Sequence, residues 1–204
     1  MKILKQIMLS IKILLLFTVI TGIIYPLFIT LVAQVFFYEK ANGSLYIEKG
    51  IIRGSFLLGQ KFTDSTYFHS RPSAINYNPM PSGASNLGLT SKFLHEQFNQ
   101  RKSNFLSTNM LNSTKEVPAE MLFASASGVD PHISKQAAYL QVPRIVKARS
   151  LNEIQINKIY KIVDSLSEYP QFGFLGNEVV NVLKLNIKLD LLKAGKWNKK
   201  WTIN

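Results

Sequence analysis

Serine, aspartate and histidine side chains lie close together between residues 125 and 132, and these are the residue types of a hydrolytic triad. They are Ser125, Ser127, Asp130 and His132. Triads are assembled from distant segments, so closeness along the chain is weak evidence for one. Turn and helix-cap chemistry is the alternative that we expect, because Pro131 disfavours helix at Asp130 and Ser134 lies where a helix would begin.

A second polar segment runs from residue 62 to residue 86 without a helical or strand period. It contains aromatic rings, an imidazole, a guanidinium and several hydroxyls, within Tyr67–Ser73 and Ser82–Leu87. Such a loop can form a polar recognition surface. It can equally be a rigid loop in which Arg71 binds backbone carbonyls. The residues alone leave both interpretations open.

Other site chemistry is not encoded in recognisable form. Phosphate-binding glycine loops, the nucleophile elbow and Ser-x-x-Lys are absent. There is no cysteine, and none of the three histidines has the spacing of a helical metal site. The net charge of +12 comes from scattered residues without a nucleic-acid recognition motif. We therefore expect no catalytic residues, no metal or cofactor of the chain's own, and no nucleic-acid partner.

An apolar stretch precedes these segments. The 26 residues from Ile13 to Tyr38 carry no charge. As a helix they would span about 39 Å, enough for a hydrocarbon core of about 30 Å. A signal peptide would have a shorter apolar region that ends in small residues, whereas aromatic residues end this one. Three lysines precede the stretch while Glu39 and Lys40 beyond it cancel, so we expect a cytoplasmic N-terminus.

Small and helix-breaking residues interrupt this predicted span. Thr21, Gly22 and Pro26 could let a neighbouring helix pack closely, or they could be tolerated without a role. We favour a helix-packing surface.

The remaining sequence predicts one α+β domain. We expect a hairpin of 44–47 and 51–58, helices at about 91–106 and 134–148, the latter bent by Pro143, and an exposed connection over 107–117. A capping box of Ser150 and Glu153 would start a third helix that ends at Ser167. A short strand at 179–182 and a few helical turns over 185–192 complete the domain. The predicted parts are a flank (1–12), a transmembrane helix (13–38), the extracytoplasmic domain (39–192) and a basic tail (193–204) that is solvated or touches anionic lipid.

Ordered matches along nearly the whole chain resemble one known family, the C subunit of the bacterial Kdp potassium-transporting ATPase. The matching segments are Thr21-Gly22, Tyr25-Pro26, Ala41–Leu45, Gly54-Ser55, Gly59-Gln60, Tyr67–Ser73, Ser82–Leu87, Ala124–Ser134, Gln141–Arg144, Ala148-Arg149 and Asn181–Leu183. The stretch 103–115 and the tail depart from the family pattern.

The resemblance implies a single-pass subunit of the bacterial inner membrane that does not itself hydrolyse ATP. Its partners would be a channel-like potassium-binding subunit, a P-type ATPase subunit and, in addition, a small single-helix subunit. The family is described as structural and also as a catalytic chaperone that raises the pump's affinity for ATP. Because the lysines place the domain outside, where there is little ATP, we favour assembly and stabilisation.

Both roles yield candidate residues. For partner contact we assign Thr21, Gly22, Pro26, His69, Arg71 and Asn86. For contact with ATP, the minority view, we assign Ser125, Ser127, Gln141 and Arg144. Outside the family, the competing hypothesis is a membrane-anchored extracytoplasmic hydrolase that uses Ser127 and His132.

Overall fold

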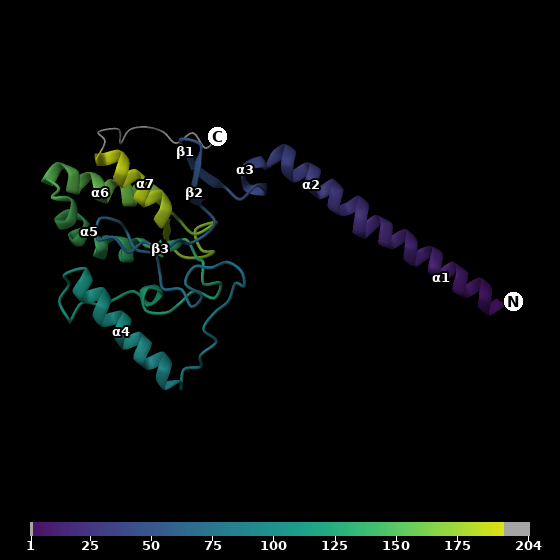
Figure 1. Cartoon of the computed structure of the whole chain (residues 1–204), viewed down its shortest axis with the longest axis horizontal. Helices are drawn as coiled ribbons and strands as arrows, with labels where there is room; N and C mark the ends of the chain where they lie inside the picture. The colour runs from purple at the N-terminus through teal and green to yellow at the C-terminus, as the bar shows by residue number, and fades with distance from the viewer. Residues whose placement is uncertain (1, 194–204) are drawn as a thin grey trace. The chain divides into compact units, whose positions relative to one another are not determined.

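The computed structural model describes residues 2–193, which form two compact units that meet in sequence between Ser44 and Leu45 (Figure 1). The predicted basic tail lies outside the described residues, except for the backbone of Lys193. The two units are described separately below.

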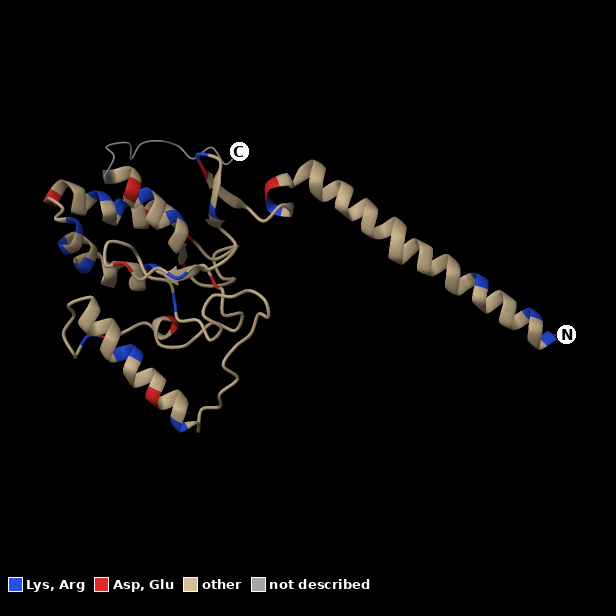
Figure 2. Cartoon of the chain, in the orientation of Figure 1, with Lys and Arg blue, Asp and Glu red and all other residues tan. Residues whose placement is uncertain are grey.

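The first unit is a long helix followed by a short one. It comprises α1 (Lys2–Val19), a π-helical segment η1 (Ile20–Ile24), α2 (Tyr25–Phe36) and α3 (Tyr38–Ala41). From Lys2 to Phe36 the mean hydropathy reaches 2.5 and no residue is buried, so this helix is long and apolar enough to cross a membrane. It begins before the predicted span and includes the basic flank. Figure 2 shows no charged residue between Lys12 and Glu39.

The second unit begins with the predicted hairpin. Strands β1 (Leu45–Glu48) and β2 (Ile51–Ser55) pair antiparallel. Lys49 and Gly50 form the turn with φ of 52° and 78°, as a two-residue hairpin turn requires. The side chain of Tyr46 packs on a small apolar cluster of Phe56, Leu183 and Ile187.

A long segment without helix or strand follows, from residue 56 to residue 91. It leads into α4 (Lys92–Thr108), where the Ser91 hydroxyl accepts a hydrogen bond from the Leu94 N–H at 3.3 Å. The loop confirms the sequence prediction, and α4 begins where a helix was expected. After α4 the chain passes through a short 3₁₀ turn, η2 (Ala119–Met121).

The rest of the domain packs helices on a small second sheet. Its antiparallel strands, in the order β3-β5-β4, are β3 (His132–Ser134), β5 (Val179–Asn181) and β4 (Ser167–Glu168). The helices are α5 (Lys135–Arg149), α6 (Glu153–Leu166) and α7 (Val182–Lys193). The α+β fold class is therefore confirmed, although β3 and β4 were not predicted.

Helix α7 lies between two apolar clusters. Leu185, Leu189 and Leu192 recur at the spacing of one helix face and belong to the main core. Leu183 and Ile187 belong to the cluster beneath the hairpin. The main core also takes buried residues from α5, α6 and β5: Ala137, Ala138, Val142, Ile145, Ile159, Ile162, Val163 and Val180.

The predicted start of the third helix was wrong. Ser150 ends α5 in a left-handed conformation with φ of 49° and does not cap α6. The capping box consists of Asn152 and Gln155, whose side chains bond to each other's backbone N–H at 2.9 and 3.0 Å. Ile154 lies in the first turn of α6 and is 68% exposed, although its spacing from Ile159 and Ile162 favours the buried face.

Two further details differ from the prediction. Asn109, within the connection that was expected to be exposed, is only 2% exposed. Its side chain bonds back to the Phe105 carbonyl at 2.8 Å and ends α4. Helix α7 begins at Val182, earlier than expected, because the Asn181 side chain accepts from the Lys184 N–H.

Candidate functional site

A buried guanidinium, that of Arg144 on α5, joins three other parts of the domain. The side chain is 3% exposed. Its Nε donates to the Asn109 side-chain oxygen at 2.9 Å, and its Nη1 donates to the Ser65 carbonyl at 2.8 Å. Its Nη2 donates to the Gln141 side-chain oxygen at 2.9 Å. Burial lowers the pKa of Arg144 to about 10, which still leaves it charged at neutral pH.

Gln141 lies one helical turn earlier and holds the backbone of His69. It is fully buried, accepts from the His69 N–H at 2.7 Å and donates to the His69 carbonyl at 3.2 Å. The Arg144 Nη1 also lies 3.0 Å from the His69 Nε2. The Asp64 carbonyl lies 3.0 Å from the same Nε2, so this nitrogen accepts from Arg144 in one tautomer and donates to Asp64 in the other.

The environment of His69 favours a neutral ring. Burial lowers the pKa of His69, and the nearby Arg144 charge lowers it further. The three side chains of Gln141, Arg144 and His69 therefore form one interior network, which fixes the 64–69 loop on α5. Their polar atoms are used to hold the protein's own backbone.

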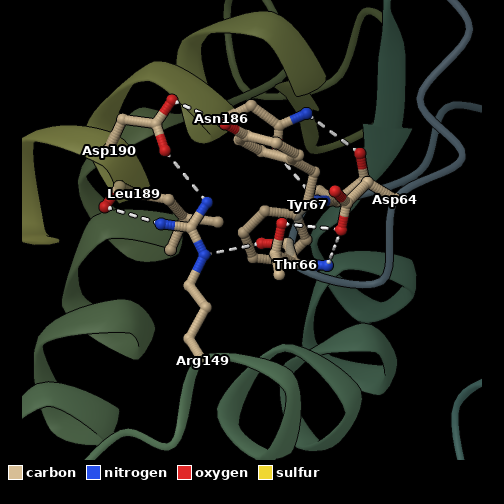
Figure 3. A network of polar contacts seen from close by, with 8 residues as sticks. Asp64, Thr66, Tyr67, Arg149, Asn186, Leu189 and Asp190 are labelled. Carbon is tan, nitrogen blue, oxygen red and sulfur yellow. Dashed lines mark hydrogen bonds and ion pairs between the residues drawn. The ribbon is translucent and has the colours of Figure 1, made fainter.

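A second polar network lies at the end of α5 (Figure 3). The Arg149 Nε donates to the Thr66 carbonyl at 2.7 Å, and its Nη2 donates to the Asp190 carboxylate at 3.0 Å. The guanidinium lies 4.9 Å from the centre of the Tyr67 ring, whose hydroxyl donates to the same carboxylate at 3.0 Å. Partial burial raises the pKa of Tyr67, and Asp190 raises it further. The network joins the polar loop to α7.

Arg71 is the loop candidate that lies beside a depression in the surface. It lines a shallow depression of about 660 Å³, together with Ser125, Ala126, Ser127 and Asp130. Arg71 Nη1 forms a 2.7 Å ion pair with Asp130. The Arg71 Nε and the Ser125 hydroxyl, both buried, have no hydrogen-bond partner in the described part of the chain.

Asp130 keeps its charge over a wide pH range. Burial would raise the pKa of this carboxyl, but hydrogen bonds from His132 and the ion pair with Arg71 outweigh burial and lower the pKa to about 2. The Asp130 carboxylate also accepts from the His132 backbone N–H at 3.0 Å, which makes a turn. Ser134 then caps α5 by accepting from the Ala137 N–H at 3.1 Å. The expected turn and cap chemistry is confirmed.

The structure regroups the candidate residues. His69, assigned to partner contact, lies with Gln141 and Arg144, which were assigned to ATP. Arg71, also assigned to partner contact, lies with Ser125 and Ser127. Asn86 is exposed, with a left-handed φ of 52°, and lines neither group. The hydroxyl of Ser127 accepts from the Val129 N–H at 3.2 Å, as in a turn.

The span candidates lie where the long helix departs from α geometry. Thr21 and Gly22 belong to η1, and Pro26 lies at the start of α2. Pro26 has no N–H, and its ring would meet the carbonyl of Gly22 in a regular helix. The helix widens instead, so that the Tyr25 N–H donates to the Ile20 carbonyl five residues back. The Thr21 hydroxyl bonds within the helix, to the Phe17 carbonyl at 2.7 Å.

Comparison with known proteins now decides the family. The sequence model described as "KdpC: K+-transporting ATPase, c chain" matches residues 7–191. The chain belongs to the KdpC family.

Curated KdpC proteins cover nearly the same length. The chain is 43% identical to the potassium-transporting ATPase KdpC subunit of Erwinia tasmaniensis, over 88% of this chain and 94% of the relative. It is 42% identical to that of Geotalea uraniireducens, over 92% and 98%. It is 40% identical to that of Mycobacterium bovis, over 92% and 99%.

Sequence reasoning missed Asn109, Arg149 and Asp190 as members of the polar networks. Asn109 and Asp190 gave no local signal, because their partners are 35 and 41 residues away in this KdpC chain. Arg149 lies in one of the segments that resemble the family, but a basic residue in the last turn of a helix has an ordinary capping explanation.

Proposed function

We propose that this chain is the assembly subunit of a potassium-transporting ATPase. The relatives' names support membership of such a complex. Its single helix packs beside the membrane-embedded part of a channel-like subunit, and its domain docks on the outer face of that subunit. ATP hydrolysis belongs to the P-type ATPase subunit, and a small single-helix subunit is a further neighbour. The membrane is the bacterial inner membrane, with the N-terminus in the cytoplasm.

The π-helical segment carries this proposal. Local π geometry is rare and is frequently found at functional sites. Here it surrounds Gly22, at which an added Cβ would meet nothing within 4 Å. A glycine in a widened turn leaves a notch on a helix that is otherwise covered by large apolar side chains, and helices in membranes associate through such small residues.

The domain supplies a second contact through the depression at Arg71. The depression is lined by the exposed residues Ala126 and Ser127 beside the Arg71–Asp130 ion pair, which suits a polar segment of a partner protein. In contrast, Gln141 and Arg144 are buried and already bonded, which supports assembly over the alternative of direct ATP contact.

Substitution of Gly22 tests the proposal. Because the position is open in the isolated chain, Gly22→Leu leaves its helix intact, and any effect reports on a neighbour. We expect Gly22→Leu to abolish co-purification of the other Kdp subunits in mild detergent and Gly22→Ala to weaken it. The control Leu27→Phe enlarges a side chain that is 65% exposed and should leave co-purification unchanged.

Unchanged co-purification of Gly22→Leu would contradict the assembly role of the notch.

The topology of the chain separates the assembly role from the catalytic-chaperone role. A reporter enzyme that works only outside the cytoplasm should be active when it is fused after residue 204. A reporter active only in the cytoplasm would favour the catalytic-chaperone alternative.

A further inference from the structure

The connection between β4 and β5 displays a cluster of exposed apolar side chains. Tyr169, Phe172, Phe174 and Leu175 are 71%, 86%, 75% and 52% exposed. No charged residue lies between Glu168 and Glu178. We call residues 169–176 the aromatic tip. Four large apolar side chains on one short loop exceed the scattered exposure that is ordinary for a surface.

The aromatic tip is held in shape by its own backbone. Gln171 and Leu175 exchange both hydrogen bonds of an antiparallel bridge, at 3.0 and 2.9 Å. The Gly173 N–H donates to the Pro170 carbonyl at 3.0 Å. Phe172 adopts a left-handed φ of 55°, which is unfavourable for a bulky residue. The loop therefore tolerates backbone strain in a conformation that exposes its aromatic rings.

The base of the aromatic tip lies close to the point where the chain enters the domain. Leu45, the first residue of β1, pairs with Ser55. The carbonyl of the next residue, Phe56, accepts from the Asn181 side chain at 2.8 Å. Asn181 ends β5, and the tip joins the other end of that strand at Val179. One strand pair, one side-chain hydrogen bond and the length of β5 therefore link Leu45 to the base of the tip.

A short connection limits how far this part of the domain can move from a membrane. The apolar helix ends at Phe36 and β1 begins at Leu45, so residues 37–44, which include α3, connect this helix to the domain. Even fully extended, eight residues reach only about 29 Å. The short tether keeps the domain near any membrane that the helix crosses, and so raises the local concentration of lipid around the domain.

We propose that the aromatic tip inserts into the interfacial zone of the lipid bilayer. Tyrosine and phenylalanine side chains suit this zone, where an apolar ring meets polar headgroups. The tip carries no charge that would have to be removed from water. Beyond the first twelve residues the chain has 21 basic and 12 acidic residues, so anionic headgroups attract the domain. The insertion gives the domain a second attachment to the membrane.

The absence of cysteine makes a direct test simple. A single Gln171→Cys variant of the full chain carries an environment-sensitive fluorophore in vesicles of phosphatidylcholine and phosphatidylglycerol. We expect blue-shifted emission, quenching by nitroxide-labelled lipid and protection from aqueous iodide. The same fluorophore at Ser103→Cys, an exposed position on α4, should show none of these.

Removal of the apolar side chains gives the decisive comparison. Adding Phe172→Ser and Phe174→Ser to Gln171→Cys should abolish quenching by the lipid nitroxide and restore quenching by iodide. Leu89→Ser with Phe93→Ser, a matched change at other exposed positions, should leave the signal as it was.

Two results would overturn the proposal. One is iodide quenching at Gln171→Cys as strong as at Ser103→Cys. The other is protection that arises only when the remaining Kdp subunits are added, which would assign the tip to a protein surface. Circular dichroism of the Phe172→Ser, Phe174→Ser variant must match that of the parent chain. If the two spectra differ, the variant Phe172→Tyr with Phe174→Tyr, which keeps both rings, replaces it. Nitroxide-labelled lipid must still quench the fluorophore in that variant, or the proposal fails.

Discussion

Replacing Arg144 by methionine removes the guanidinium and keeps most of the unbranched side chain. The Asn109 side-chain oxygen, on a residue only 2% exposed, loses its 2.9 Å donor. The Ser65 carbonyl loses its 2.8 Å donor, and the His69 ring keeps its contact with the Asp64 carbonyl alone. The 64–69 loop is then attached to α5 mainly through Gln141.

The cost follows from the acceptors that are left without donors. Each buried group without a partner destabilises by about 1–3 kcal/mol, so two give roughly 2–6 kcal/mol. Methionine recovers part of this, because burying the guanidinium was itself unfavourable, as its lowered pKa of about 10 indicates. We expect a net loss of about 3 kcal/mol in the free energy of unfolding. For a domain of this size that lowers Tm by about 6–12 °C.

Thermal unfolding of the full chain in detergent, followed by circular dichroism, measures this loss. The matched control is Arg53→Met, because the Arg53 side chain is 52% exposed and its 3.4 Å pair with Glu48 is at the surface. Surface pairs contribute less than about 1 kcal/mol. If Arg144→Met melted within about 2 °C of the control, the network would not stabilise the domain as argued.

Three further changes probe other parts of the domain. The pKa of His69 is lowered in the folded chain, so the unfolded chain takes up a proton first as pH falls below about 6.5, and the folded state loses stability below that pH. The Tm values at pH 7.5 and 5.5 should therefore differ less for His69→Gln than for the parent chain. Asp130→Asn removes the partner of Arg71 and should cost roughly 1–2 kcal/mol at pH 7; because the pKa of Asp130 is lowered to about 2, the difference should vanish in urea titrations as pH falls from about 4 towards 2. Asn152→Ala removes the cap of α6 and should cost about 1 kcal/mol in the same titrations, and an unchanged midpoint would contradict the assigned cap.

Local rules predicted the parts of the fold that depend on neighbours in sequence. The hairpin turn at Lys49-Gly50 and the caps at Ser91 and Ser134 follow from residues only a few positions apart. The capping box predicted for the third helix was wrong because two candidate patterns overlap there. They are Ser150 with Glu153 and Asn152 with Gln155. The structure uses the second pattern, since Ser150 occupies the left-handed end of α5.

The missed features depend on contacts between distant segments. Strands β3 and β4 have three and two residues, too few for an alternating pattern, and exist because each pairs with β5. The interior network needs Gln141 and Arg144 to meet residues of the 64–69 loop that are 72 and 79 positions away in sequence. The sequence predicted these residue types as functional candidates but could not predict which of them would meet.

Photo-crosslinking in the intact membrane tests the assembly role most directly. A photoreactive amino acid in place of Ala126, an exposed residue that lines the depression beside Arg71, reports what lies against this surface. In cells that produce the whole Kdp complex, we predict a crosslink to the channel-like subunit and its loss in the Gly22→Leu variant. A crosslink to the ATP-hydrolysing subunit's cytoplasmic part, or no crosslink in a functioning complex, would contradict the account.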